Sequence, residues 1–520
     1  MREKVQEVPY SYHTFIFPFL FDNGGKRNRK EFIKCLPNLG EGWREEKLQE
    51  LQGSVKEFHD QHRYFNKAAR NAMYTTEFDD SAVVWNYRFD LESLIKNNLC
   101  KNDWYNNPKC KDNKARLDIE KKLENGVIFN AKLAINGIRL KLFNTGVGML
   151  VFELENYDLP EEKDVILINE FGRRVFLPFI KNDQEPICKL CADQITLFFG
   201  DDVIEEASGK ISGAEDFCIN EIKLSPLVQF FLSNEKKCIT ASERPAADEY
   251  YIEPIIDDRM YVACIYDNSS FMGDMKQWDQ EAKAYRYIAD AERLYPNADD
   301  NLAKRLYEMV FIDGDGMSCY SRTMLKSLLE KHIYTRWLEM GTITGITEYS
   351  MISITNFPMA TFLPFVTEYV EMVMLVLAQR ASLLAFERTI SEIACKKNNL
   401  DVENVQKKYV MFQSELLLQE VTAQQQGIEL YNILLDKLFI NQQQAGIEAQ
   451  IKSLFELNTS TNEKSENGIL FILAVLGISE AAQTIFGEWL SRPELSPYIS
   501  LMFLICIIIW KQIRKRNWRK

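Results

Sequence analysis

The sequence predicts a mixed α+β N-terminal domain, followed by a long α-helical stalk and two C-terminal transmembrane helices. Three observations support this fold class. Strand-like and helical runs are mixed over residues 1–360, a proline-free helical pattern follows, and the strongest apolar runs close the chain. We therefore divide the 520 residues into a body (1–360), a stalk (361–462) and a membrane part (463–520).

The body has the patterns of an α+β domain. Residues 127–156 alternate apolar and polar side chains, and Asn136-Gly137 in their middle predicts a hairpin turn. Strands are further predicted over 164–180 and 259–266, and a helix over 279–307.

The stalk is predicted from its helical periodicity. Residues 401–457 contain no proline, and apolar residues recur at helical spacing. At 1.5 Å per residue they would form one rod of roughly 90 Å. A second helical stretch, 364–397, precedes it. Asn398-Asn399 between the two predicts a turn, so we expect the two helices to pack antiparallel.

Two apolar stretches near the C-terminus, at 468–487 and 497–513, approach the roughly 20 residues that cross a bilayer. Basic residues are far more frequent after Trp510 than in the loop between the stretches. The positive-inside rule therefore predicts that both termini are cytosolic. This gives a multi-pass protein of the cytoplasmic (inner) membrane, in contact with the lipid bilayer. The alternative is a pair of buried core helices in a soluble protein.

The first of these spans carries a polar stripe. One helical face contains Leu473, Leu476, Glu480, Gln483, Thr484 and Gly487. An ionised carboxylate at membrane depth costs about 2.5–3.5 kcal/mol, so Glu480 should face water. In a symmetric homo-oligomer these carboxylates would form a cation-attracting ring, with the leucines as a gate. Alternatively, Glu480 bonds a neighbouring helix or lies in the membrane interface.

Composition and motifs argue against several other classes. A net charge of -13 disfavours direct nucleic-acid binding. The sequence has no P-loop, Rossmann fingerprint, HExxH or GxSxG motif, so no enzyme is predicted. Cys188 and Cys191 form a CxxC without the second pair that structural zinc needs, and we interpret them as incidental thiols. We predict no resident metal or cofactor, and residues 313–316 are predicted as a turn.

Anion-binding candidates lie in the body. Arg173-Arg174 follow Gly172 and are predicted to open a strand over 175–180. Paired arginines suit planar or phosphate anions. Weaker ligand-binding candidates are Asp258, at the mouth of another predicted strand, and Arg336 with Trp337, a cation and an aromatic plate that a nucleotide-like ligand would need. Surface charge and ordinary packing are the alternatives for each.

The order of body, long helix, two terminal spans and basic tail resembles the CorA magnesium-transporter superfamily. Members end the first span with Gly-Met-Asn, followed shortly by a Pro-Glu element. Here Gly487 matches, Glu488 and Trp489 replace the next two residues, and Pro493-Glu494 follow. Because the signature asparagine coordinates the hydrated ion in the family, its loss puts magnesium selectivity in doubt.

Motifs in the body resemble, more specifically, the CorA-like membrane effectors of type III CRISPR systems. The matching segments are Tyr12–Phe19, Asn144–Gly148, Asn169–Arg174 and Arg336–Thr342. The resemblance implies a homopentamer that senses a nucleotide second messenger, S-adenosylmethionine joined to AMP (SAM-AMP), and opens a cation channel in antiviral defence. Arg173 and Arg174 would then contact the anion. Two other functions stay open: a constitutive magnesium or divalent-metal transporter, and a membrane-anchored enzyme or scaffold.

Overall fold

The computed structural model describes a set of segments between residues 8 and 456: 8–22, 28–36, 42–46, 63–75, 82–90, 115–175, 191–199, 202–208, 221–222, 224–232, 239–240, 250–257, 259–276, 300–314, 316, 318–356, 358–396 and 399–456. Contacts divide the chain into two compact units, Met1–Thr389 with Lys407–Ile447, and Ile390–Gln406 with Glu448–Lys520. The first unit contains both sheet and helices, as expected for a mixed α and β body.

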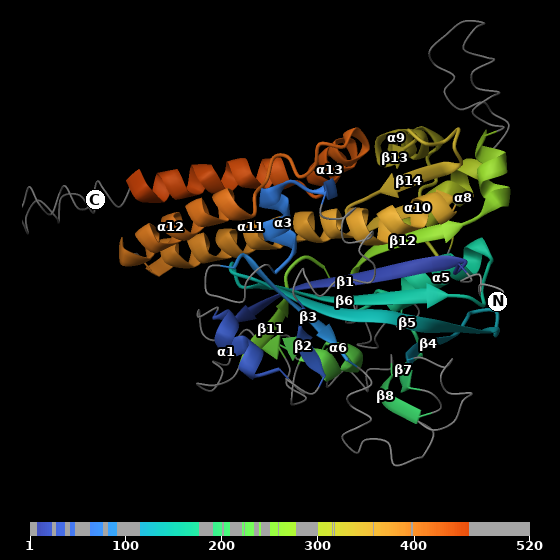
Figure 1. The fold of residues 1–520 in the computed structure, drawn as a ribbon, viewed down its shortest axis with the longest axis horizontal. Helices are drawn as coiled ribbons and strands as arrows, with labels where there is room; N and C mark the ends of the chain where they lie inside the picture. Colours follow the sequence, from blue (N-terminus) through green and yellow to red (C-terminus); the bar gives the residue numbers. More distant parts are fainter. Residues whose placement is uncertain are drawn as a thin grey trace, which may run out of the picture. The chain divides into compact units, whose positions relative to one another are not determined.

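A 13-stranded sheet forms the centre of the first unit (Figure 1), with the strand order β13-β14-β15-β12-β1-β6-β5-β4-β7-β8. Strand β11 also pairs with β1, and β3 joins β2 to β5. Among the described pairs, β12 and β15 run parallel and the others antiparallel. The strands are β1 (Ser11–Asp22), β2 (Trp43–Glu45), β3 (Val84–Phe89), β4 (Ala115–Lys122), β5 (Ile128–Phe143), β6 (Val147–Asn156), β7 (Gln194–Phe199), β8 (Asp202–Ser208), β11 (Tyr251–Pro254), β12 (Tyr261–Asp267), β13 (Ile333–Tyr334), β14 (Thr342–Ile346) and β15 (Ser350–Thr355). The short strands β9 (Glu221–Ile222) and β10 (Ile239–Thr240) form a separate pair.

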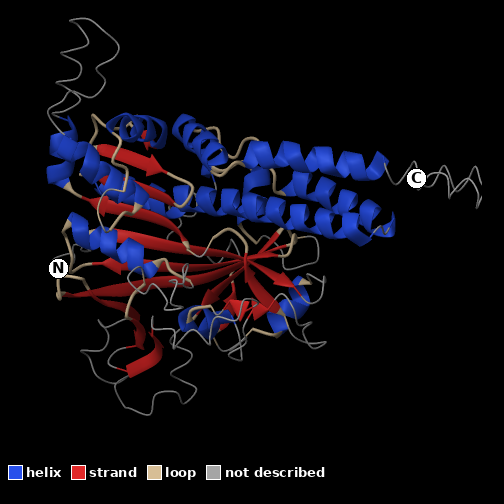
Figure 2. Cartoon of the chain, turned by 180° about the vertical axis from the view of Figure 1, so that it is seen from behind, coloured by secondary structure: helices blue, strands red, loops and turns tan. Residues whose placement is uncertain are grey.

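One face of the sheet is strongly aromatic, because alternate residues of a strand point to the same side. From β1 this face receives Phe15, Phe17, Phe19 and Phe21, all buried. Helices α1 (Arg29–Lys34), α5 (Glu162–Gly172) and α6 (Pro226–Leu232) contribute side chains to the same core. Figure 2 shows helices on both faces of the strands.

The other face of the sheet meets a long helical segment. It comprises α10 (Pro358–Pro364), the π-helical turn η6 (Phe365–Tyr369) and α11 (Val370–Lys396), in agreement with the helix predicted over 364–397. Phe386 of α11 contacts Tyr409 and Phe412 of α12 (Asn399–Glu415). Gln379 of α11 donates to the Leu416 carbonyl just after α12, so α11 and α12 run antiparallel as predicted.

The remaining helices are α3 (Lys67–Met73), α8 (Asp300–Phe311), α9 (Arg322–His332) and α13 (Gln425–Lys437), and residues 440–456 are also helical. Strand β12 confirms the strand predicted over 259–266. Of the helix predicted over 279–307, the described part belongs to α8, and 279–299 lie outside the described residues.

The hairpin turn predicted at Asn136-Gly137 is wrong. Strand β5 continues through both residues, and a bulge between Ile135 and Gly137 shifts its register against β6. A Cβ at position 137 would lie 2.5 Å from a Glu153 carboxylate oxygen, so the glycine lets this side chain approach closely and does not form a turn. The chain turns later, before β6, where Gly146 has a positive φ of 88°.

The single rod predicted over 401–457 is also wrong. Between α12 and α13 the chain is not helical, and an isolated β-bridge pairs Thr422 with Phe65. Asn66 donates its amide to the Glu420 carbonyl, and Thr422 donates to the Tyr64 carbonyl at 2.5 Å. The Val421 carbonyl also accepts from the Asn66 backbone amide at 2.9 Å, so the carbonyls of Glu420 and Val421 bond to Asn66 and not within a continuous helix. Phe439, with φ of 59°, ends the next helical stretch.

The strand predicted over 164–180 is a helix in its described part. Residues 162–172 form α5, which buries Val165, Ile168 and Phe171 against the sheet at helical spacing. Arg173 therefore caps the end of a helix and does not open a strand, while 176–180 lie outside the described residues. The short apolar run Val165–Ile168 suits a buried helix as well as a strand.

Candidate functional site: a cationic cavity at the end of helix α5

A cavity of about 670 Å³ opens where α5 ends, beside the last residues of β4 and the end of α8. Its volume lies in the usual range for small-ligand sites, roughly 300–1,000 Å³. The charged side chains of its lining are of both signs. The basic ones are Lys121, Lys122, Lys163, Arg173 and Arg259, and the acidic ones are Glu124, Glu170 and Asp313. The lining thus has an excess of positive charge in a chain whose net charge is -13. Two of the five cations already have partners outside the lining, because Lys121 pairs with Asp193 at 3.1 Å and Arg259 pairs with Asp257 at 2.6 Å. The cations that remain to favour an anionic ligand are Lys122, Lys163 and Arg173.

Arg173 is the most unusual of these residues. Its side chain is 3% exposed, and one terminal nitrogen, Nη2, contacts the Glu170 carboxylate at 2.5 Å and the Ile312 carbonyl at 3.2 Å. Within the described residues, Nε and Nη1 have no hydrogen-bond partner. Burial, only partly offset by Glu170, lowers the pKa of Arg173 to about 10, so the guanidinium remains charged at neutral pH. Buried donors without partners are costly, and this makes Arg173 the leading candidate among the lining residues for contact with an anion.

The neighbouring arginines are positioned by backbone contacts. Arg174 forms an isolated β-bridge with Arg259, and the amide of Met260 donates to the Arg173 carbonyl at 2.7 Å. Arg174 also contacts Glu170 at 2.9 Å. The Arg259 guanidinium lies over the Tyr349 ring, 4.2 Å from its centroid. Strand β12 is thereby fixed to the end of α5, and Arg259 is held at the wall of the cavity.

The end of α8 and the residues after it supply aromatic surface and a strained turn to the lining. Tyr307 and Phe311 of α8 stack with ring centroids 4.6 Å apart. Ile312 follows in the left-handed conformation, with φ of 54°. This conformation is rare for a β-branched residue, and such strain concentrates at functional sites. The strained turn directs the Ile312 carbonyl to Arg173 and places Asp313 in the lining.

Two of the predicted ligand residues lie elsewhere in the fold. Arg336 contacts Glu429 of α13 at 2.5 Å, and Trp337 is 37% exposed beside it. Neither residue lines the cavity. The structure therefore does not bring the sequence candidates into one site. It places Arg173 and Arg174 together, Arg336 and Trp337 apart from them, and Asp258 lies outside the described residues.

Sequence reasoning missed the aromatic wall. Tyr307, Phe311 and Ile312 are separated by more than a hundred residues from the arginine pair, and nothing in their local pattern signals a ligand. Lys121-Lys122 at the end of β4 gave a faint signal. Adjacent residues of a strand point to opposite faces, so two adjacent lysines predict a cation on each face of the sheet. Asp313 accepts from the Ser318 amide at 2.8 Å, as suits the turn predicted here.

The predicted pore residues lie outside the described residues: Leu473, Leu476, Glu480, Gln483, Thr484, Gly487, Glu488 and Trp489. Cys188 of the CxxC pair lies outside them too, and Cys191 is buried. Among the described helices, Ala360–Ala394 is long and apolar enough to cross a membrane by length and composition alone. Its residues up to Thr389 belong to the first compact unit, where Glu371 bonds to Arg139 and Lys141 of β5.

With this geometry established, the chain was compared with known proteins. No protein-family model, no curated protein and no solved structure matches it.

Proposed function

We propose that this protein is a ligand-gated cation channel whose body binds an anionic, nucleotide-type ligand in the cavity at the end of α5. The observation that supports this best is Arg173, a buried guanidinium with two nitrogens lacking partners beside a cavity of about 670 Å³. A phosphate would accept from both nitrogens, as guanidinium forks favour. The stacked Tyr307 and Phe311 offer a flat apolar surface for a base.

The pore half of the proposal rests on the sequence. The stripe through Glu480 would line a cation path in a homo-oligomer anchored in the cytoplasmic membrane. The resemblance to CorA-like effectors of type III CRISPR systems adds a pentamer, SAM-AMP as the messenger and antiviral depolarisation as the outcome. Ligand binding opens the pore only if the ligand binds the open state more tightly than the closed one.

The binding half is tested by titrating the full-length protein in detergent with SAM-AMP, AMP and ATP while following thermal unfolding. We expect at least one of the three to raise the melting temperature, and Arg173→Met to abolish that rise. The matched control is Arg44→Met, an exposed arginine paired with Asp90 away from the cavity. If no nucleotide shifts the melting temperature, the constitutive divalent-metal transporter becomes the better explanation.

A further inference from the structure

The long helical segment over the sheet contains a local defect. Between α10 and α11, residues 365–369 form a π-helical turn in which the Val370 amide bonds to the Phe365 carbonyl five residues earlier. Pro364 has no amide hydrogen, and Thr367 donates its hydroxyl to the Leu363 carbonyl at 2.6 Å. A π-turn holds one more residue than the α-turn it replaces, and such turns are frequent at functional sites.

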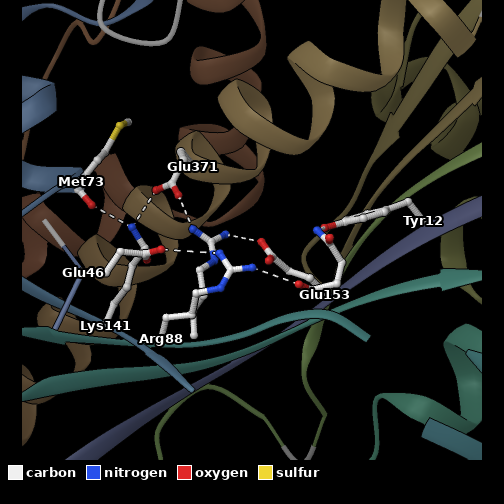
Figure 3. Close-up of polar contacts among 9 residues, drawn as sticks. Tyr12, Glu46, Met73, Arg88, Lys141, Glu153 and Glu371 are labelled. Atoms are coloured by element: carbon white, nitrogen blue, oxygen red, sulfur yellow. Dashed lines mark hydrogen bonds and ion pairs between the residues drawn. The ribbon is translucent and has the colours of Figure 1, made fainter. Parts of the chain in front are cut away.

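The helix is fixed to the sheet on both sides of this π-turn. Before it, the Phe362 ring packs edge-on against Tyr12 of β1, with centroids 5.5 Å apart. After it, the Glu371 carboxylate accepts from Arg139 at 2.8 Å and from Lys141 at 2.7 Å, both on β5. Figure 3 shows Glu371 reaching from the helix toward the sheet to meet the Lys141 ammonium.

Four of these charged groups are named the helix cluster: Arg139, Lys141, Glu153 and Glu371. Within the described residues, the Nε of Arg139 has no hydrogen-bond partner. Arg139 also contacts Glu153 at 2.6 Å, and Lys141 donates to the Met73 carbonyl at 2.7 Å. Glu371 is 4% exposed. Burial alone would raise the pKa of Glu371, but Lys141 and Arg139 more than offset this and hold it below its ordinary value. The carboxylate therefore remains ionised and tied to the sheet.

We propose that the π-turn 365–369 is a register joint, at which α11 moves by one residue relative to α10 and releases Glu371 from the helix cluster. A shift of one residue rotates an α-helix by about 100° and advances it by about 1.5 Å. Such a rotation would take Glu371 out of reach of Arg139 and Lys141. Because Pro364 lacks an amide hydrogen and Thr367 covers the Leu363 carbonyl, the turn gives up few regular helical bonds in moving.

The cavity and the joint are connected by one strand. Tyr349, which lines the cavity under Arg259, directly precedes β15. At the other end of β15, Thr355 accepts from Thr361 of α10 at 3.2 Å. A displacement of Tyr349 by a ligand would therefore reach α10 through a single strand. The signalling role of the joint thus rests on the proposed function, whereas the mobility of the joint does not.

The joint is tested by hydrogen–deuterium exchange of the full-length protein in lipid nanodiscs. Deleting Thr367 removes the additional residue, so the turn becomes α-helical while Phe362 and Glu371 keep their faces. We expect amides of 365–369 to exchange at least tenfold more slowly in the deletion variant than in the wild type. Thr367→Val, which keeps the residue and removes only the hydroxyl, should exchange like the wild type. Equal exchange in the deletion variant and the wild type would overturn the proposal.

A second variant keeps the proposal testable if the deletion variant does not fold. Glu371→Gln weakens the helix cluster without shortening the helix. We expect it to raise amide exchange over 370–389 at least tenfold and to leave exchange in β5 within twofold. Unchanged exchange over 370–389 would overturn the proposal independently of the deletion.

The signalling role has its own readout, the melting shift with SAM-AMP and cation flux from vesicles containing the same proteins. The deletion variant should retain the melting shift and lose ligand-stimulated flux. If flux in the deletion variant responds like that of the wild type, the joint does not carry the signal. If SAM-AMP changes the melting temperature of none of these proteins, the proposed function fails. The exchange experiment still tests the joint, because it does not depend on the ligand.

Discussion

Two buried charge clusters in the body differ in how completely they are paired. In the helix cluster, the carboxylates of Glu153 and Glu371 engage both terminal nitrogens of Arg139, and Glu371 also pairs with Lys141. In the cluster beside the cavity, Arg173 uses one of its three nitrogens. The difference indicates that a paired cluster holds elements together, whereas an incompletely paired one beside a cavity is suited to receive a ligand.

The largest effect on stability is expected when a carboxylate is removed from the helix cluster. Glu371→Ala would leave Arg139 and Lys141 facing each other in a buried site. Breaking a buried ion pair typically costs about 3–5 kcal/mol, and we expect a loss of that size in the free energy of unfolding. Urea unfolding followed by the fluorescence of the buried Trp43 and Trp85 measures it. A loss below about 1 kcal/mol would show that the cluster does not stabilise the fold.

A buried titratable group with neutral hydrogen-bond partners is expected to change stability with pH. His13 lies between Ser11 and Asn169, and burial lowers its pKa to about 4. Since the folded pKa is depressed, the unfolded chain binds more protons below pH 6.5, and stability falls as the pH drops toward 4. The shift predicts a loss of about 3 kcal/mol over this window. His13→Gln should flatten the unfolding free energy over the same window, and an equally steep profile would assign the loss to other groups.

The incompletely paired cluster is tested through binding. Arg173→Met removes two charge-assisted hydrogen bonds from any bound phosphate, each about 1.5–3 kcal/mol. We therefore expect nucleotide affinity to fall by about 100-fold or more in calorimetric titration, since each 1.4 kcal/mol is tenfold. The unfolding free energy should change far less than in Glu371→Ala, because Glu170 keeps Arg174 as a partner. Unchanged affinity would remove Arg173 from the site.

The smallest effect is expected at the exposed pair between Arg336 and Glu429. Exposed ion pairs contribute about 0–1 kcal/mol, so Glu429→Gln should change the unfolding free energy by less than 1 kcal/mol. Nucleotide affinity should also stay the same, because neither residue lines the cavity. A loss of affinity would restore Arg336 to the ligand site, where the sequence placed it.

Local patterns predicted those elements whose formation depends on local chemistry. The helix over 364–397 and the strand β12 follow from periodicity and apolar content. The turn predicted at Asn136-Gly137 is wrong because Gly137 lies where the Glu153 side chain of the neighbouring strand approaches closely, and not in a turn. The break after α12 likewise depends on residues 64–66, more than 350 positions away in the sequence. Contacts between residues so distant in the sequence cannot be predicted from the local pattern.

The candidate site was half predictable for the same reason. Paired arginines signal anion binding by their chemistry alone. Arg173 and Arg174 share Glu170 as a partner, and Arg173 lines the cavity, whereas Arg174 is not part of the lining. The aromatic wall on α8 and the strained Ile312 are positioned by packing against α5 and β15. No spacing in the sequence could reveal that arrangement, and Arg336 has the right chemistry in the wrong place.

The central claim, that ligand binding in the body opens a cation path, is tested most directly by ion flux. Full-length protein in vesicles would be exposed to SAM-AMP while cation release is recorded. The account predicts release from wild-type vesicles, and none from vesicles with Arg173→Met or with Glu480→Leu. Equal release with and without ligand, or an unchanged response in Arg173→Met, would contradict it.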